Sequence, residues 1–179
     1  MLQLVVPNLE VYDDGKSEFI IKKGQILQVE HSLVSIAKWE SKWNKPFLTN
    51  KAKTIEETID YIKCMTITQN VLPYIYSQIT NENVNQVSEY IALPMSATWF
   101  TNEDNTPSKE IITSEIIYYS MIAYNIPFEC QKWHLNRLLT LIRVCKKKND
   151  KPKKMSRTEI VNRNRELNNK RRQQSNSKG

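Results

Sequence analysis

The stretch Ile126–Cys145, IPFECQKWHLNRLLTLIRVC, decides the fold that we expect from this sequence. Pro127 suits the first turn of a helix, because its missing N–H has no partner there in any case. The apolar residues that follow recur at intervals of three and four, as on one face of a helix: Leu135, Leu138, Leu139, Ile142 and Cys145. Trp133 and Leu141 widen that face. We therefore expect a central helix, with the upstream chain packed against it.

The length and composition indicate one domain with an appendage. The chain has 179 residues, 40% of them hydrophobic, with four tryptophans, which is enough to build a core. No apolar run approaches the roughly 18 residues that a membrane span needs. The start, MLQLVVPNLEVYDD, lacks the basic beginning and long apolar middle of a signal peptide, so we expect a cytoplasmic protein. The three cysteines lie in apolar segments and are expected to be buried free thiols.

The net charge of +7 is concentrated at one end of the chain. Residues 146–179 contain 13 Lys and Arg against 3 Asp and Glu, whereas residues 1–145 contain 13 against 16. The body is therefore mildly acidic and the C-terminal arm strongly basic. The chain has only three glycines, and they are not clustered. A phosphate-binding loop needs several neighbouring glycines, so the common nucleotide-binding enzymes are disfavoured.

The expected fold class is mainly α with a small N-terminal antiparallel β meander, an α+β protein. Residues 1–31 contain apolar runs separated by turn signals at Asp13-Asp14-Gly15 and Lys22-Lys23-Gly24, and are predicted to form the meander. Residues 32–145 are predicted to form a helical bundle, and 146–179 a basic linker, an arm helix and a disordered tail.

Capping signals mark three of the expected helices. Ser32 is a plausible N-cap for a helix through Trp43, and Thr54 with Glu57 forms a capping box for the next helix. Ser156 with Glu159 forms a second capping box, which should begin the arm helix through about Arg172. The helix within residues 111–125 is apolar nearly all round, which is typical of a helix buried in a bundle or in an oligomer contact.

Two surfaces are predicted to bind partners. Trp39 and Trp43 are four residues apart and share a helix face, which fits either a core pair or a partner-binding ridge. The arm offers a row of cations: Arg157, Arg163, Arg165, Lys170, Arg171 and Arg172. Such a row fits phosphate contacts with nucleic acid, docking on an acidic protein surface, which includes other copies of the chain, or simple solubilisation. The arm has no aromatic residue, so base stacking is not supported.

No constellation for catalysis, metal binding or cofactor binding stands out. Cys130 and His134 have the spacing of two metal ligands on one helix face, but two ligands do not make a site. Cys130 has no evident orienting partner for nucleophilic chemistry beyond that histidine. Neighbouring carboxylates such as Glu56 and Glu57 lie at a helix start, where capping explains them. We therefore expect a protein that is not an enzyme and has no cofactor.

Four segments together resemble a family of small proteins encoded in the structural modules of tailed bacteriophages: EHSLVSIAKWESKWNKPF, TIEETIDYIKCMTITQNV, EIITSEIIYYSMIAYNIPFECQKWHLNRLLTLIRVC and KKMSRTEIVNRNRELNNKRRQ. The resemblance covers nearly the whole chain, and the family is similar to tail assembly chaperones. It implies a mainly helical protein that binds the tape-measure protein during assembly, keeps its long apolar helix soluble and recruits tube subunits. The family has no catalytic residues to transfer.

The leading hypothesis from the sequence is a non-enzymatic phage morphogenesis protein in the host cytoplasm, with tape-measure and tube proteins as partners, self-association and no membrane. One alternative is a virion-resident tail or head–tail connector protein, because the β start departs from a plain helical chaperone. The other is a packaging protein that binds DNA through the basic arm.

Overall fold

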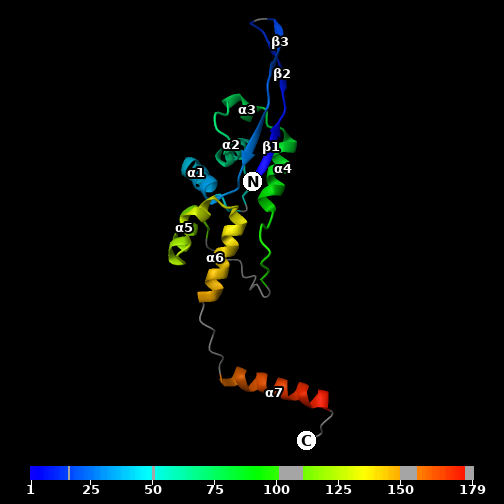
Figure 1. The fold of residues 1–179 in the computed structure, drawn as a ribbon, viewed down its shortest axis with the longest axis vertical. Coiled ribbons are helices and arrows are strands. Elements are labelled where there is room, and N and C mark those ends of the chain that lie inside the picture. The colour runs from blue at the N-terminus through cyan, green and yellow to red at the C-terminus, as the bar shows by residue number, and fades with distance from the viewer. Residues whose placement is uncertain (16, 50, 101–110, 150–156, 176–179) are drawn as a thin grey trace. The chain divides into compact units, whose positions relative to one another are not determined.

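The computed structural model describes residues 1–179 except 16, 50, 101–110, 150–156 and 176–179. The chain divides into two compact units, Met1–Lys146 and Lys147–Gly179, and each is considered by itself. The first unit contains all of the strands and most of the helices that the structure describes (Figure 1). The fold is mainly α with an antiparallel β start, as the sequence predicted.

The four strands form one long, two-stranded hairpin. The outer pair is β1 (Leu2–Val6) with β4 (Gln25–Val29), and the inner pair is β2 (Leu9–Asp13) with β3 (Glu18–Lys22). Both pairs are antiparallel and keep the same register, since Leu2 opposes Val29 and Leu9 opposes Lys22. The expected antiparallel β start is confirmed, but the turn predicted at Lys22-Lys23-Gly24 is not formed. β3 and β4 follow one another along one side of a single ribbon and do not pair with each other.

The lower half of the hairpin belongs to the core. Its inward side chains, Leu4, Val6, Leu27 and Val29, are all buried. Alternate residues such as Val5 and Ile26 are exposed, as the period of two in a strand requires. The free edge of β4 is covered by the segment after the second helix, because Gln28 O accepts from Ile67 N at 2.8 Å and Gln28 N donates to Thr68 Oγ1 at 2.8 Å.

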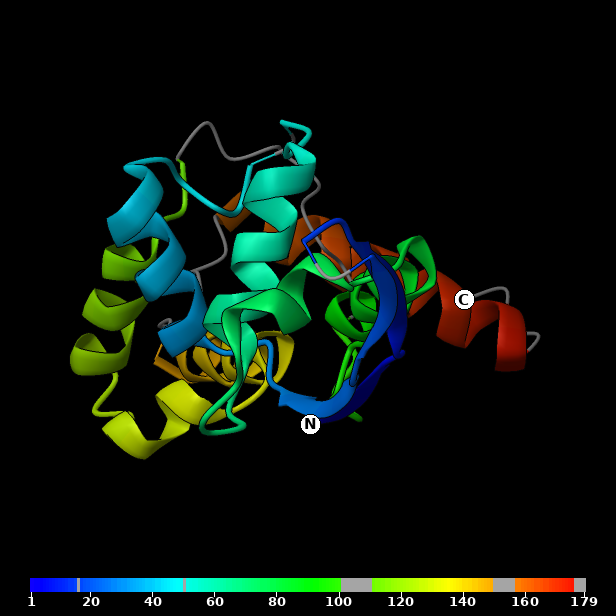
Figure 2. The ribbon, with the colours of Figure 1, turned by 90° about the horizontal axis from the view of Figure 1, so that it is seen from above.

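Local capping explains where the next two helices begin. α1 (Leu33–Trp43) starts with a capping box between Ser32 and Ser35, and α2 (Ile55–Met65) with one between Thr54 and Glu57. α1 ends at Asn44, whose φ of 51° places it in the left-handed conformation that suits a helix C-terminus. The two helices pack against each other (Figure 2).

A short helix and a longer one complete the side of the first unit that lies against the strands. α3 (Pro73–Ser77) has its proline in the first turn, where a missing N–H costs nothing. α4 (Asn81–Ala92) begins with a capping box between Thr80 and Asn83 and packs against β1 and α2. Val87 and Tyr90 are its buried core residues.

The stretch that organised the sequence-based prediction differs from the expected single central helix. It begins with a 3-10 turn, η1 (Phe128–Lys132), and only then continues as α6 (Leu135–Asn149). Within α6, Leu135 and Leu138 are buried, whereas the apolar residues from Leu139 to Cys145 are half-buried. The prediction of a centrally buried helix is therefore wrong beyond its first turn.

The nearly all-apolar helix is α5 (Ser114–Ala123), and it packs against α1 (Figure 2). Ile117 and Met121 face the core, while Tyr119 and Ile122 are exposed. Because α5 is apolar all round, its sequence period could not show which face would be covered.

The second unit contains α7 (Arg157–Ser175). The predicted arm helix is present, and it runs through Gln173 and Gln174, which the sequence had assigned to a disordered tail. The predicted N-cap Ser156 lies outside the described residues. Over the described part of the chain, none of the helices has the length and apolar character that crossing a bilayer requires.

Candidate partner-binding surfaces

The upper half of the hairpin, residues 9–22, extends beyond the helices of the first unit, and we call it the hairpin tip (Figure 1). Tyr12 and Phe19 are directly opposed across its two strands, and their rings meet edge to face with centroids 5.1 Å apart. Ile21 lies on the same face. These three side chains are 49%, 68% and 62% exposed, so the aromatic pair is open to solvent.

The opposite face of the hairpin tip is also apolar. Val11 and Ile20 are cross-strand partners that half-bury each other, and Leu9 beside them is 44% exposed. A two-stranded ribbon with apolar residues on both faces cannot bury either face on its own. Exposed aromatic residues at a protruding position are typical of surfaces that bind other proteins.

Acidic side chains surround the end of the hairpin tip. Asp13, Asp14 and Glu18 lie on or beside its turn, and Glu10 lies further along β2, opposite Ile21. Gly15 N donates to Asp13 Oδ1 at 3.0 Å, an Asx-type bond that closes the turn. The tip therefore combines an apolar centre with a negative rim.

A close backbone contact joins the hairpin tip to the buried half of the ribbon. Gly24 N donates to Asn8 Oδ1 at 2.7 Å, and a Cβ placed on Gly24 would lie only 2.0 Å from Val6 O. Only glycine allows the backbones to approach this closely. At the same level, Gln78 Nε2 donates to Lys22 O at 3.3 Å, which ties the tip to the end of α3.

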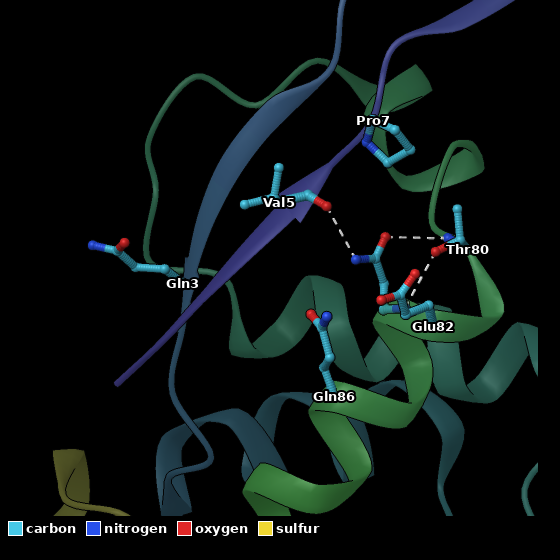
Figure 3. A pocket seen from close by; sticks show the side chains of 7 residues that line it. Gln3, Val5, Pro7, Thr80, Glu82 and Gln86 are labelled. Carbon is cyan, nitrogen blue, oxygen red and sulfur yellow. Dashed lines mark hydrogen bonds between the residues drawn. The ribbon is translucent and has the colours of Figure 1, made fainter.

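Figure 3 shows a shallow hollow of about 360 Å³ between the edge of β1 and the start of α4. Asn83 lines it, and its side chain donates to Val5 O at 3.0 Å while its Oδ1 accepts from Thr80 N at 3.3 Å. Its other lining residues are Gln3, Pro7, Glu82 and Gln86. Because Asn83 occupies Val5 O and Pro7 has no N–H, this part of the strand edge is less suited to the addition of another strand.

A polar cluster around two histidines lies inside the first unit. His31 and His134 are 1% and 6% exposed. His31 Nδ1 is 2.5 Å from Tyr61 Oη, and His134 Nε2 donates to the carbonyl oxygen of Tyr90 at 3.1 Å. Asn136 N donates to His134 Nδ1 at 3.3 Å, so His134 is held as the neutral Nε2–H tautomer.

Burial sets the charge state of this cluster. Desolvation lowers the pKa of His31 to about 3, and the neighbouring His134 lowers it further in the same direction. Burial also lowers the pKa of His134, against a raising effect of its bond to Tyr90. Both histidines are thus neutral, hydrogen-bonded core residues.

The tryptophan ridge predicted from the sequence is part of the core. Trp39 is 2% exposed, and its Nε1 donates to Glu57 O at 2.9 Å. Trp43 is half-buried, stacks on Trp39 with centroids 6.0 Å apart, and donates to Asp60 Oδ2 at 2.9 Å. Trp39 is therefore not part of an exposed ridge, and its burial agrees with the alternative of a core pair. A partner-binding role for the half-buried Trp43 stays a prediction.

The predicted cations of the arm lie on α7, where the structure leaves their side chains exposed: Arg157, Arg163, Arg165, Lys170, Arg171 and Arg172. Their role as partner-binding residues stays a prediction. Cys130 and His134 do not share a helix face, because Cys130 belongs to η1 and an extended residue separates it from α6. Among the described residues, no group of three or more His, Cys, Asp and Glu is placed to hold a metal ion.

Sequence reasoning missed the hairpin tip as a binding surface. The signal was present in residues 18–22, EFIIK, where three consecutive apolar residues break the strict alternation of a strand with one solvated face. No family model, curated protein or solved structure matches this chain.

Proposed function

We propose that this chain is a non-enzymatic bacteriophage morphogenesis protein, specifically a tail assembly chaperone that binds the tape-measure protein through the hairpin tip. The observation that carries the proposal is the exposed Tyr12–Phe19 pair on a ribbon that extends beyond the first unit. The phage role rests on the resemblance of the four quoted segments. Tube subunits and other copies of the chain are further partners, and the host cytoplasm is the place of action.

The chemistry of the hairpin tip suits an apolar helical partner. Tyr12, Phe19 and Ile21 offer a contiguous apolar face, and burying an aromatic side chain of this kind stabilises a complex by about 2 kcal/mol or more. The acidic rim of the tip keeps the free protein soluble and favours a partner with basic residues beside its apolar stripe. A chaperone needs such a surface and needs no catalytic centre.

Co-expression with the tape-measure protein tests this proposal. The double substitution Tyr12→Ser with Phe19→Ser should lower the affinity of the co-purifying complex at least tenfold, because two contact residues are lost. The control is Tyr119→Ser on α5, which removes a tyrosine that is 71% exposed, more than the 49% of Tyr12, at a surface away from the hairpin tip. Wild-type affinity in a folded double variant would remove the hairpin tip from the proposal.

A virion-resident tail or connector protein is the second candidate, and the same hairpin favours it. A long ribbon extending from a body can reach onto a neighbouring subunit and stay there. Mass spectrometry of purified virions separates the two candidates. Absence of the chain from virions supports the chaperone, and stoichiometric presence supports the structural protein.

A further inference from the structure

The helix α7 has properties that the hairpin-based function does not use. Its described side chains from Arg157 to Gln174 are all exposed. The helix contains six Arg and Lys against two Glu, and six Asn and Gln. Its apolar residues Ile160, Val161 and Leu167 are 46%, 45% and 43% exposed. It is therefore a cationic helix rich in side chains that hydrogen-bond.

The order of residues gives α7 one face without carboxylates. Arg157, Asn164 and Asn168 follow at intervals of seven and four, so they lie along one side of the helix. Arg165 and Arg172, seven residues apart, adjoin that side. Glu166 is two residues from both asparagines, which places it on the opposite side. No described carboxylate thus interrupts this face, which also carries Val161 four residues after Arg157.

The same spacing argues against docking in an apolar protein groove. A helix that binds such a groove needs apolar anchors at i, i+3 or i+4 and i+7. Ile160 and Leu167 are seven apart, but the positions between them on that face are Arg163 and Asn164. The apolar stripe is therefore interrupted by polar residues halfway along its length.

We propose that the face of α7 bearing Arg157, Asn164, Arg165, Asn168 and Arg172 binds double-stranded DNA in the major groove. The proposal goes beyond the chaperone function and does not depend on it. Charge complementarity supports the proposal, because the positive side chains of α7 can contact the regularly spaced phosphates of DNA. The major groove of B-DNA admits an α-helix, and the 19 residues of α7 extend over about 28 Å.

The asparagines and arginines of this face are suited to different contacts with DNA. Asparagine pairs with the N6 and N7 atoms of adenine through two hydrogen bonds, so Asn164 and Asn168 are placed to contact base edges. Arg165 and Arg172 flank them and contact phosphates, which supplies affinity without sequence information. Arg157 extends the contact at the first turn. No aromatic residue is present, which agrees with an intact duplex in place of stacked single-stranded bases.

Fluorescence anisotropy with the full-length protein and a labelled 24-base-pair duplex, between 50 and 200 mM salt, tests the proposal. Binding should weaken steeply with salt, with a slope of about −0.9 in log K against log salt for each phosphate contact. The double substitution Arg165→Gln with Arg172→Gln should reduce that slope by about 1.8 and weaken binding at least tenfold at 100 mM salt. Glu166→Gln removes a negative charge from the opposite side of α7, so it should strengthen binding only slightly, through the net charge of the helix.

The matched control is Lys51→Gln with Lys132→Gln, which removes two exposed positive charges from the first unit. It should leave the salt slope nearly unchanged. Asn164→Ala with Asn168→Ala should keep the slope but abolish enrichment of any motif from a random duplex library. These readouts are independent of the tape-measure complex, so the two proposals fail separately.

Three results would overturn the DNA assignment. One is no binding at 50 mM salt, and another is an equal loss in the control and the arginine variants. The third is tighter binding to an RNA duplex, whose deep and narrow major groove does not admit a helix. If the wild-type protein did not bind DNA and the arginine variants lost a protein complex, we would conclude that α7 binds an acidic protein and not DNA.

Discussion

The imidazole rings of His31 and His134 meet edge to face, with 5.1 Å between their centroids. The two histidines lie far apart in the sequence. Their backbones are joined as well, since the N–H of Leu135, the residue after His134, donates to His31 O at 2.7 Å. Tyr61, Tyr90 and Glu30 surround the pair, and Tyr90 Oη donates to Glu30 Oε1 at 2.6 Å. A charge on His31 would be buried and would face the ring of His134, and both effects lower the pKa of His31, whereas nearby Glu30 favours a charge on His134 alone.

Stability should therefore fall as the pH is lowered from neutrality. The folded pKa of His31 is about 3 while the unfolded value is about 6.5, so the unfolded chain binds the extra proton between these values. The stabilisation is complete above pH 6.5 and is lost progressively toward pH 3. His31 alone should cost roughly 2 kcal/mol between pH 7 and pH 5. Urea unfolding at the two pH values measures this loss.

The substitution His31→Phe isolates the source of that pH dependence. The variant keeps an aromatic ring in the core but cannot titrate, so the change in unfolding free energy between pH 7 and pH 5 should shrink by roughly 2 kcal/mol. The variant should also lose about 1 kcal/mol at pH 7, because Tyr61 Oη loses a partner. An unchanged pH dependence would assign the effect to other groups.

A buried carboxylate should prove important for the packing of α1 against α5. Glu40 Oε1 accepts from Phe47 N at 2.7 Å, and Oε2 accepts from Ser114 N at 2.8 Å. Glu40→Gln can accept through one oxygen only, which leaves a buried N–H without a partner and costs about 1–3 kcal/mol. Chemical denaturation measures the change, and Glu89→Gln on the exposed side of α4 serves as the control. Equal stabilities of the two variants would contradict this role.

Gly24 should be intolerant of any side chain. Gly24→Ala places a methyl group against Val6 O and Pro7, so the two halves of the hairpin must shift at a cost of about 1–3 kcal/mol or more. Gly15→Ala is the matched control, because its Cβ would lie 3.3 Å from the flexible Asp13 Oδ1. Thermal unfolding of both variants tests the difference. A Gly24 variant as stable as the Gly15 variant would show that the ribbon adjusts freely.

Trp39→Ala should destabilise the fold by about 3–5 kcal/mol, because it removes a buried indole and its bond to Glu57 O. Trp39→Phe keeps most of the volume and should cost less. Trp43→Ala should cost less than Trp39→Ala as well, since Trp43 is only half-buried. Urea denaturation of the three variants ranks them. A fully stable Trp39→Ala variant would mean that this part of the core repacks.

Local interactions were predictable from the sequence. The starts of α1 and α2 follow from Ser32 and from Thr54 with Glu57, because a capping bond spans only three residues. The arm helix was also expected, although its end lies beyond Arg172. The hairpin turn follows from the signal at Asp13-Asp14-Gly15, which is again local, whereas the turn predicted at Lys22-Lys23-Gly24 is not formed, because β3 and β4 follow one another along one side of the ribbon.

Whether a candidate surface is open to a partner depends on which side chains are buried, and the sequence pattern does not show this. The spacing of Trp39 and Trp43 shows that they share a face, but not that α2 covers that face through Glu57 and Asp60. Conversely, Tyr12 and Phe19 have the residue types of a core strand, yet the ribbon carries them away from the helices.

The sequence by itself determined the fold class, the starts of α1 and α2 and the basic character of the arm, because these depend on contacts between near neighbours and on composition. Only the tertiary structure decided that His31 meets His134, that Trp39 is covered and that Phe19 is open to solvent. The physical reason is that periodicity specifies which residues share a face, whereas long-range packing decides which faces are removed from water.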